Sequence, residues 1–212
     1  MERLGSGAGE QEQIVQARTA TDYSKVEPDT ELVKLCAGGD VDAYAELVSR
    51  HQRAVYGIVS RMVRQRDDVD DLVQDVFVLA YRSIGSFRGD SSFSTWLGAI
   101  AVNASLKHMK RSKNRQALSI DDPEIALGEV LSTNEPDPED AVQARARNAA
   151  VRKAIDTLPD KQRTVVVLHY FEDYTCEEIA KMLRCSVGTV WSRLHYACKK
   201  LRGQLDWLGS GG

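Results

Sequence analysis

The sequence predicts an all-α fold of two small helical domains joined by a flexible acidic linker. Apolar residues recur at three- and four-residue spacings over residues 29–115 and again over 139–206, as in amphipathic helices. Residues 116–138 contain three prolines and a run of acidic side chains, a composition typical of a linker. The β-branched run at 164–168 lies between helical flanks, which favours a buried helix over a strand.

The two ends of the chain lack this periodicity. Residues 1–28 are rich in Gly, Gln, Glu and Thr and are predicted to be a disordered arm, and residues 207–212 a flexible tail. No apolar stretch approaches the roughly 18 residues that span a bilayer, and the N-terminus lacks the apolar segment of a signal peptide. The sequence therefore predicts a cytoplasmic protein without membrane insertion.

Helices account for most of residues 29–115. A short helix ends at Gly38, a second carries apolar residues from Ala43 to Met62, and a third begins near Asp67, where acidic side chains meet the positive helix N-terminus. The buried stripe of this third helix is expected to be Val69, Leu72, Val73, Val76 and Ala80. The outward residues are then Asp71, Gln74, Asp75, Val78 and Arg82.

A loop rich in glycine and serine precedes the fourth helix and contains Phe87 and Phe93, with Trp96 just after it. The helix is expected from about Thr95 to Lys110, and residues 104–115 hold five basic side chains and no acid. The loop thus delivers aromatic side chains beside a basic helix. Phe87 and Trp96 could equally belong to the core.

Charge is strongly segregated, although the formal net charge is only −3. Residues 118–144 contain eight acidic side chains and no Lys or Arg, whereas residues 179–205 contain six basic side chains and no acid. Two basic surfaces therefore flank one acidic tether, and basic surfaces of this kind attract nucleic acid.

A helix-turn-helix is predicted between about Thr175 and Leu201. Thr175 and Glu178 have capping-box spacing, Ser186 can cap the following helix after a short turn, and Ala180 is small where the helices would approach. The apolar stripe of the second helix is Val187, Val190, Leu194, Ala197 and Leu201. A helical hairpin with a solvated basic face would share the stripe, but the absence of acids favours DNA recognition.

The sequence indicates neither catalysis nor a metal site. It contains no P-loop and no nucleophile elbow, so no catalytic residue, enzyme activity or cofactor is predicted. The four cysteines form no CxxC pair and are expected to be reduced thiols. Three of them lie near His195, but only His195 and Cys198 have helical spacing, which argues against a metal role.

Three segments together resemble bacterial sigma factors of the extracytoplasmic-function (ECF) type, in the sigma-70 superfamily. Residues 70–77 (DDLVQDVF) are similar to the helix that docks on the clamp coiled coil of RNA polymerase. Residues 87–103 resemble the minus-ten melting segment, and residues 177–194 the minus-thirty-five reader. The resemblance implies a sigma-2-like four-helix domain over 29–115 and a sigma-4-like domain over 139–206.

The resemblance also implies site residues. Contacts with polymerase would come from Asp71, Gln74, Asp75 and Val78, although a merely solvated helix face would look the same. Contacts with minus-ten DNA would come from Phe87, Trp96, Asn103, Lys107, Lys110 and Arg111, the first three lining a pocket for a flipped base. Contacts with minus-thirty-five DNA would come from His169, Cys176, Thr189, Trp191, Ser192, Arg193, His195, Tyr196 and Lys199. Relatives more often carry Arg or Lys at positions 191 and 196.

The implied function is a sigma factor that binds core RNA polymerase and directs promoter-specific initiation. Its partners would be polymerase, double-stranded promoter DNA, the melted non-template strand and an anti-sigma factor. Two alternatives stay open: a helix-turn-helix regulator that acts without polymerase, and a sigma mimic that sequesters an anti-sigma factor. The acidic helix face and the aromatic loop disfavour the first, and the two basic surfaces disfavour the second.

Overall fold

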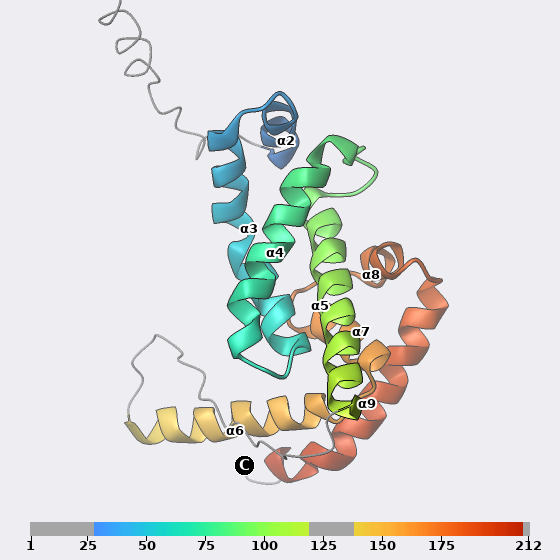
Figure 1. Cartoon of the computed structure of the whole chain (residues 1–212). Helices are drawn as coiled ribbons and strands as arrows, with labels where there is room; N and C mark the ends of the chain where they lie inside the picture. The colour runs from blue at the N-terminus through green and yellow to red at the C-terminus, as the bar shows by residue number, and fades with distance from the viewer. Residues whose placement is uncertain (1–27, 119–137, 210–212) are drawn as a thin grey trace, which may run out of the picture. The chain divides into compact units, whose positions relative to one another are not determined.

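The computed structural model describes residues 28–118 and 138–209, and within these ranges every regular element is helical, as expected (Figure 1). Most of the predicted arm and linker and the end of the predicted tail lie outside the described residues. The helices are α2 (Asp29–Ala37), α3 (Val41–Met62), α4 (Asp67–Ser83), the 3-10 turn η2 (Ile84–Ser86), α5 (Phe93–Leu118), α6 (Pro138–Asp156), α7 (Asp160–Tyr170), α8 (Cys176–Leu183) and α9 (Val187–Gly209). No helix in the described part of the chain is both long and apolar enough to cross a membrane.

The chain forms two compact units, one ending at Arg50 and the other starting at His51. The first contains α2 and the beginning of α3. Gly39, with φ of +94°, follows α2 in a backbone conformation that suits glycine. Asp40 then caps α3, because its Oδ1 accepts the backbone N–H groups of Asp42 and Ala43 at 3.0 and 3.1 Å.

In the second unit, α4 packs against α5 (Figure 1). The predicted stripe of α4 is confirmed at Val69, Leu72, Val76 and Ala80, which are buried, while Val73 is half-buried.

The fourth helix is longer at both ends than the sequence predicts. It begins at Phe93 rather than Thr95, because Ser92 caps it: Ser92 Oγ accepts the Thr95 N–H at 3.1 Å. It continues past Lys110 to Leu118, and the basic residues of this stretch are favourable near a helix C-terminus.

The C-terminal helices pack around α9, which contacts α6, α7 and α8 (Figure 1). Residues 164–168 are helical and buried within α7, as predicted. α9 runs to Gly209, so the first part of the predicted tail is also helical.

One buried side chain of α7 is charged. Arg163 is 0% exposed, and its guanidinium donates to the carbonyl oxygens of Asp156 at 2.8 Å, Met62 at 3.1 Å and Ile155 at 3.3 Å. A fourth carbonyl, that of Leu158, lies 3.5 Å away. The guanidinium therefore donates to carbonyls at the ends of α3 and α6, and it shares those of Ile155 and Asp156 with the Leu158 N–H and with Arg64.

Candidate nucleic-acid and polymerase interfaces

The predicted helix-turn-helix is confirmed as α8, a three-residue turn and α9. Thr175 and Glu178 form the predicted capping box: the Thr175 N–H donates to Glu178 Oε2 at 2.9 Å, and the Glu178 N–H donates to Thr175 Oγ1 at 3.2 Å. α8 ends at Leu183, and the residue that caps it, Arg184, has a left-handed φ of 49°. Ser186 Oγ accepts the Thr189 N–H at 3.1 Å and so caps the start of α9. Local hydrogen bonds therefore fix where both helices begin.

Replacing Thr175 tests this cap. We expect Thr175→Ala to lower the free energy of unfolding by about 1 kcal/mol, because a backbone N–H of the first turn loses its acceptor. Urea unfolding followed by circular dichroism measures the change. Lys181→Ala, at an exposed position of the same helix, is the control and should stay within about 0.5 kcal/mol of the parent. Equal effects of the two substitutions would show that the cap is not a source of stability.

The packed side of α9 is apolar and its opposite side carries the candidate DNA residues. Val190, Leu194 and Ala197 are buried, with Ala180 of α8 at the helix contact. On the outer side Trp191 and Tyr196 are 59% and 61% exposed. The other exposed or half-buried candidates there are Thr189, Ser192, Arg193, His195 and Lys199. One face of α9 therefore presents every predicted α9 residue to solvent.

Two further minus-thirty-five candidates lie outside α9. Cys176 begins α8 and is 5% exposed, and burial raises the pKa of its thiol. A contact from this position would therefore use the backbone N–H at the helix N-terminus rather than the sulfur. His169, near the end of α7, is half-buried and has Nδ1 3.0 Å from the Tyr174 carbonyl oxygen, which leaves Nε2 for another partner.

The aromatic loop folds into a three-ring cluster. The ring centroids of Phe87 and Trp96 are 5.6 Å apart. The ring centroid of Phe93 lies 5.9 Å from that of Phe87 and 5.6 Å from that of Trp96. Phe93 is 3% exposed, whereas Phe87 and Trp96 are half-buried. Phe93 thus anchors the cluster in the core, and the two predicted residues combine a core contact with an accessible edge.

Trp96 begins a stripe along α5 that ends in basic residues. Asn103, Lys107 and Lys110 follow it at intervals of seven, four and three residues, which places all four on one side of the helix. Arg111 lies beside the last of them, and Asn103 and the three cations are exposed. An aromatic edge, an amide and a line of positive charge therefore follow one another along a single helix.

The outward face of α4 is as the sequence predicts. Asp71, Gln74, Asp75 and Val78 are all exposed, Val78 to 46%. Two residues that the sequence analysis did not single out, Leu79 and Tyr81, are 47% and 42% exposed on the same helix. The α4 face thus combines acidic and amide groups with an apolar portion larger than expected.

Comparison with known proteins identifies the family of the chain that carries these surfaces. The Sigma-70 region 2 model matches residues 47–115, and the Sigma-70, region 4 model matches residues 148–201. The RNA polymerase sigma-H factor of Pseudomonas aeruginosa is 35% identical over 174 residues, which are 81% of this chain and 90% of that protein. The chain belongs to the ECF group of sigma-70 family sigma factors. This sigma factor therefore directs promoter recognition by RNA polymerase and is a non-catalytic polymerase subunit.

Two more comparisons extend over most of the sigma factor. The ECF RNA polymerase sigma-E factor of Haemophilus influenzae is 36% identical over 184 residues, 85% of this chain and 96% of that protein. Among solved structures, CnrH in complex with the cytosolic domain of CnrY has a TM-score of 0.62 and 28% identity, covering 84% of this chain and 97% of that one.

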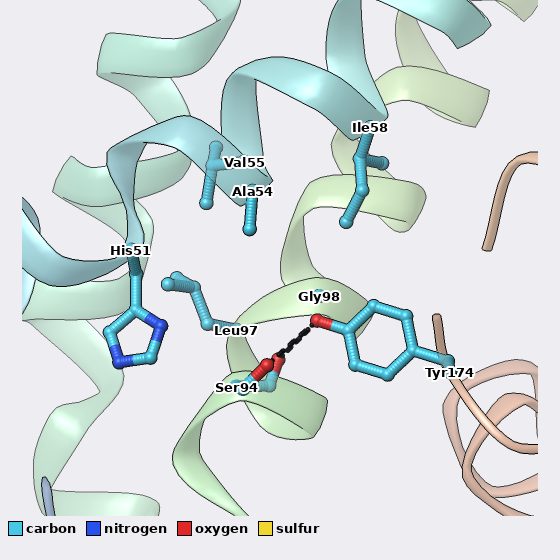
Figure 2. A pocket seen from close by; sticks show the side chains of 8 residues that line it. All are labelled: His51, Ala54, Val55, Ile58, Ser94, Leu97, Gly98 and Tyr174. Atoms are coloured by element: carbon cyan, nitrogen blue, oxygen red, sulfur yellow. Dashed lines mark hydrogen bonds between the residues drawn. The ribbon is translucent and has the colours of Figure 1, made fainter. Parts of the chain in front are cut away.

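Helices of region 2 and region 4 of the sigma factor are in contact, and α5 packs against α8. Figure 2 shows Tyr174, in the loop before α8, pointing toward Ser94 and Gly98 of α5. Its hydroxyl donates to the Ser94 carbonyl oxygen at 3.1 Å and lies 2.9 Å from Ser94 Oγ. A Cβ at Gly98 would lie 3.0 Å from the Tyr174 hydroxyl, so glycine permits the approach. The space among these residues is too small to admit even a water molecule.

Two carboxylates of region 4 also reach region 2. Glu178 Oε1 accepts a hydrogen bond from Thr95 Oγ1 at 3.1 Å. Glu172 Oε1 lies 3.1 Å from Arg61 Nη1, and its side chain is only 9% exposed. Burial raises the pKa of Glu172 to about 7, although Arg61 acts in the opposite direction. None of these contacts could be predicted from the sequence, because each joins residues far apart in the chain.

Proposed function

We propose that this sigma factor docks on core RNA polymerase through α4, reads the minus-thirty-five element with α9, and holds the melted minus-ten strand against α5. The observation that carries the proposal is the presence of two basic, acid-free surfaces on one chain, over residues 104–115 and 179–205. Such surfaces bind the phosphate backbone and release counterions, so their affinity falls as salt rises. Strand opening is driven by binding energy rather than by hydrolysis.

At the minus-thirty-five element, α9 enters the major groove as the second helix of the helix-turn-helix. Its exposed aromatic, hydroxyl and basic side chains face base edges and phosphates. His169 and the N-terminus of α8 contact the DNA backbone on either side and so fix the position of α9 in the groove. The proposed contacts are His169, Cys176, Thr189, Trp191, Ser192, Arg193, His195, Tyr196 and Lys199.

At the minus-ten element, an unpaired base of the non-template strand leaves the stack and lies against Phe87 and Trp96. An extruded base needs an aromatic or apolar wall and a polar group for its edge. The half-buried rings supply the wall, and Asn103 supplies the amide. Lys107, Lys110 and Arg111 hold the neighbouring phosphates, because they continue the same side of α5.

Toward polymerase, the α4 face offers Asp71, Gln74 and Asp75 to a basic partner surface, with Val78 as its apolar contact. We expect Asp75→Lys to weaken binding to core polymerase about tenfold or more, because like charges then face each other across the interface. Competition with a labelled sigma factor for core polymerase measures the affinity. Asp42→Lys introduces the same charge change at an exposed position of α3 and is expected to leave the affinity nearly unchanged. Comparable losses in both variants would mean that net charge, not the α4 face, controls binding.

An anti-sigma factor is the remaining proposed partner, and it would cover the same surfaces. The structural similarity to CnrH, which was solved in complex with the cytosolic domain of CnrY, supports a protein partner for this chain. The exposed side chains of Val78, Leu79 and Tyr81 provide apolar area that such a partner would bury.

Reconstitution with core polymerase tests the proposal. The full chain is mixed with core enzyme, bound complexes are isolated, and the recovered genomic DNA supplies templates for run-off transcription. Promoter-specific transcripts are expected, and Trp96→Ala is expected to lose them on duplex templates more than on templates with a pre-melted minus-ten region. Polymerase binding without specific transcripts would favour the sigma mimic. DNA binding without polymerase binding would favour the independent regulator.

A further inference from the structure

The exposed face of α9 carries two large aromatic side chains. Trp191 and Tyr196 leave more than half of their surface in solvent, with values of 59% and 61%. At about 100° per residue, they lie on either side of Ser192, which points away from the buried stripe. Two large rings therefore flank a small side chain at the centre of the outer face.

Three polar side chains in this part of α9, those of Thr189, Ser192 and Arg193, form hydrogen bonds within the protein. Ser192 Oγ donates to the Thr189 carbonyl oxygen at 3.0 Å, and Thr189 Oγ1 lies 2.8 Å from Ser186 Oγ. Arg193, the one arginine between residues 187 and 201, is half-buried and directs Nη1 toward Cys185 Sγ at 3.9 Å. Guanine is usually read by an arginine or lysine that extends freely to O6 and N7. The start of α9 does not present such a side chain.

We infer that Trp191, supported by Tyr196, makes this sigma factor select thymine in the minus-thirty-five element through the C5-methyl group. The methyl is the apolar feature that a base pair presents in the major groove, and aromatic rings are suitable partners for it. Ser192 leaves room between the rings for the methyl to approach. The inference rests on the proposed role of α9 as the minus-thirty-five reader.

A protein partner is the other possible occupant of exposed aromatic side chains. DNA is favoured because residues 179–205, which include the two rings, contain six basic side chains and no acid, and such a segment complements the charge of phosphate. Lys199 is exposed on α9, about one turn after Tyr196 and about two turns after Trp191. From there its ammonium group can reach the phosphate backbone of the DNA.

The experiment uses the reconstituted holoenzyme and duplexes selected from a library randomised in the minus-thirty-five region. We expect thymine to be enriched at one or more positions. Replacing such a thymine by deoxyuracil removes the methyl and leaves the pairing edge intact. This should weaken the parent about fourfold, the factor that corresponds to the burial of one methyl-sized group. In Trp191→Ala the same replacement should have no effect.

Three further variants sharpen the result. Trp191→Phe should keep the sensitivity to deoxyuracil, because it keeps the apolar contact. Trp191→Arg should shift the selected base toward guanine. Lys199→Ala should weaken binding to all sequences while keeping the sensitivity.

Selection of guanine by the parent, or equal binding of thymine and deoxyuracil duplexes, would overturn the inference while leaving the sigma function intact. Failure of the holoenzyme to enrich any minus-thirty-five sequence would instead overturn the proposed role of α9. Loss of sensitivity in Trp191→Phe as well would also count against the methyl contact, provided that circular dichroism shows a folded variant.

Discussion

Replacing Arg163 by methionine is expected to lower the free energy of unfolding by about 3 kcal/mol or more. Methionine has a comparable length but no donor, so the buried Met62 carbonyl oxygen would lose the Arg163 guanidinium that it now accepts from. The carbonyl oxygens of Asp156 and Ile155 would keep only their other donors, the Arg64 guanidinium and the Leu158 N–H. Arg163→Lys should have an intermediate effect, because an ammonium cannot reproduce the planar fork of donors.

Denaturant unfolding followed by circular dichroism measures these changes. Lys161→Met makes the same chemical replacement at an exposed position of α7 and should change stability by less than about 0.5 kcal/mol. An Arg163→Met variant as stable as the Lys161→Met control would show that water or a rearranged side chain replaces the lost donors.

The second large effect concerns pH. The pKa of Glu172 is raised from 4.5 to about 7, chiefly by burial, with Asp173 adding to the increase and Arg61 and Arg53 opposing it. At pH values between 4.5 and about 7, the Glu172 carboxyl is protonated in the folded protein but ionised in the unfolded chain. Stability therefore falls as pH rises from about 4.5 to 7.

Glu172→Gln is expected to remove this loss, because glutamine stays neutral. The variant should match the parent near pH 4 and exceed it above pH 7 by up to about 3 kcal/mol, from the size of the pKa change. Unfolding measured from pH 4 to 8 tests this. Arg61→Met should extend the pH range over which stability falls to higher pH, since Arg61 lowers the pKa of Glu172. A stability difference between Glu172→Gln and the parent that does not vary with pH would contradict the assignment.

Features that depend on neighbouring residues could be predicted from the sequence. The capping box of Thr175 and Glu178 and the Ser186 cap are local, so the bounds of the helix-turn-helix follow from them. The start of α5 was predicted two residues late, because Ser92 and Thr95 are both hydroxyl residues that could cap. In the structure Ser92 accepts the Thr95 N–H.

Features that depend on distant residues could not be predicted. Arginine side chains usually lie at the surface, so the sequence alone does not predict that Arg163 is buried. Its acceptor, the Met62 carbonyl oxygen, lies 101 residues away in the chain. Gly98 is an unfavourable residue inside a helix, and the close approach of Tyr174 and Met182 explains it. The exposure of the α4, α5 and α9 candidates followed from helical periodicity, whereas their partners were implied by the resemblance to sigma factors.

Glu178 divides its two oxygens between separate tasks. Oε2 accepts from Thr175 and closes the capping box, while Oε1 accepts from Thr95 of α5. The contact with α5 can therefore be exchanged for water without loss of the cap, and α8 stays folded when it is released. Release of region 4 from region 2 would also break the Tyr174–Ser94 hydrogen bond and the Arg61–Glu172 ion pair, and neither of these belongs to the cap.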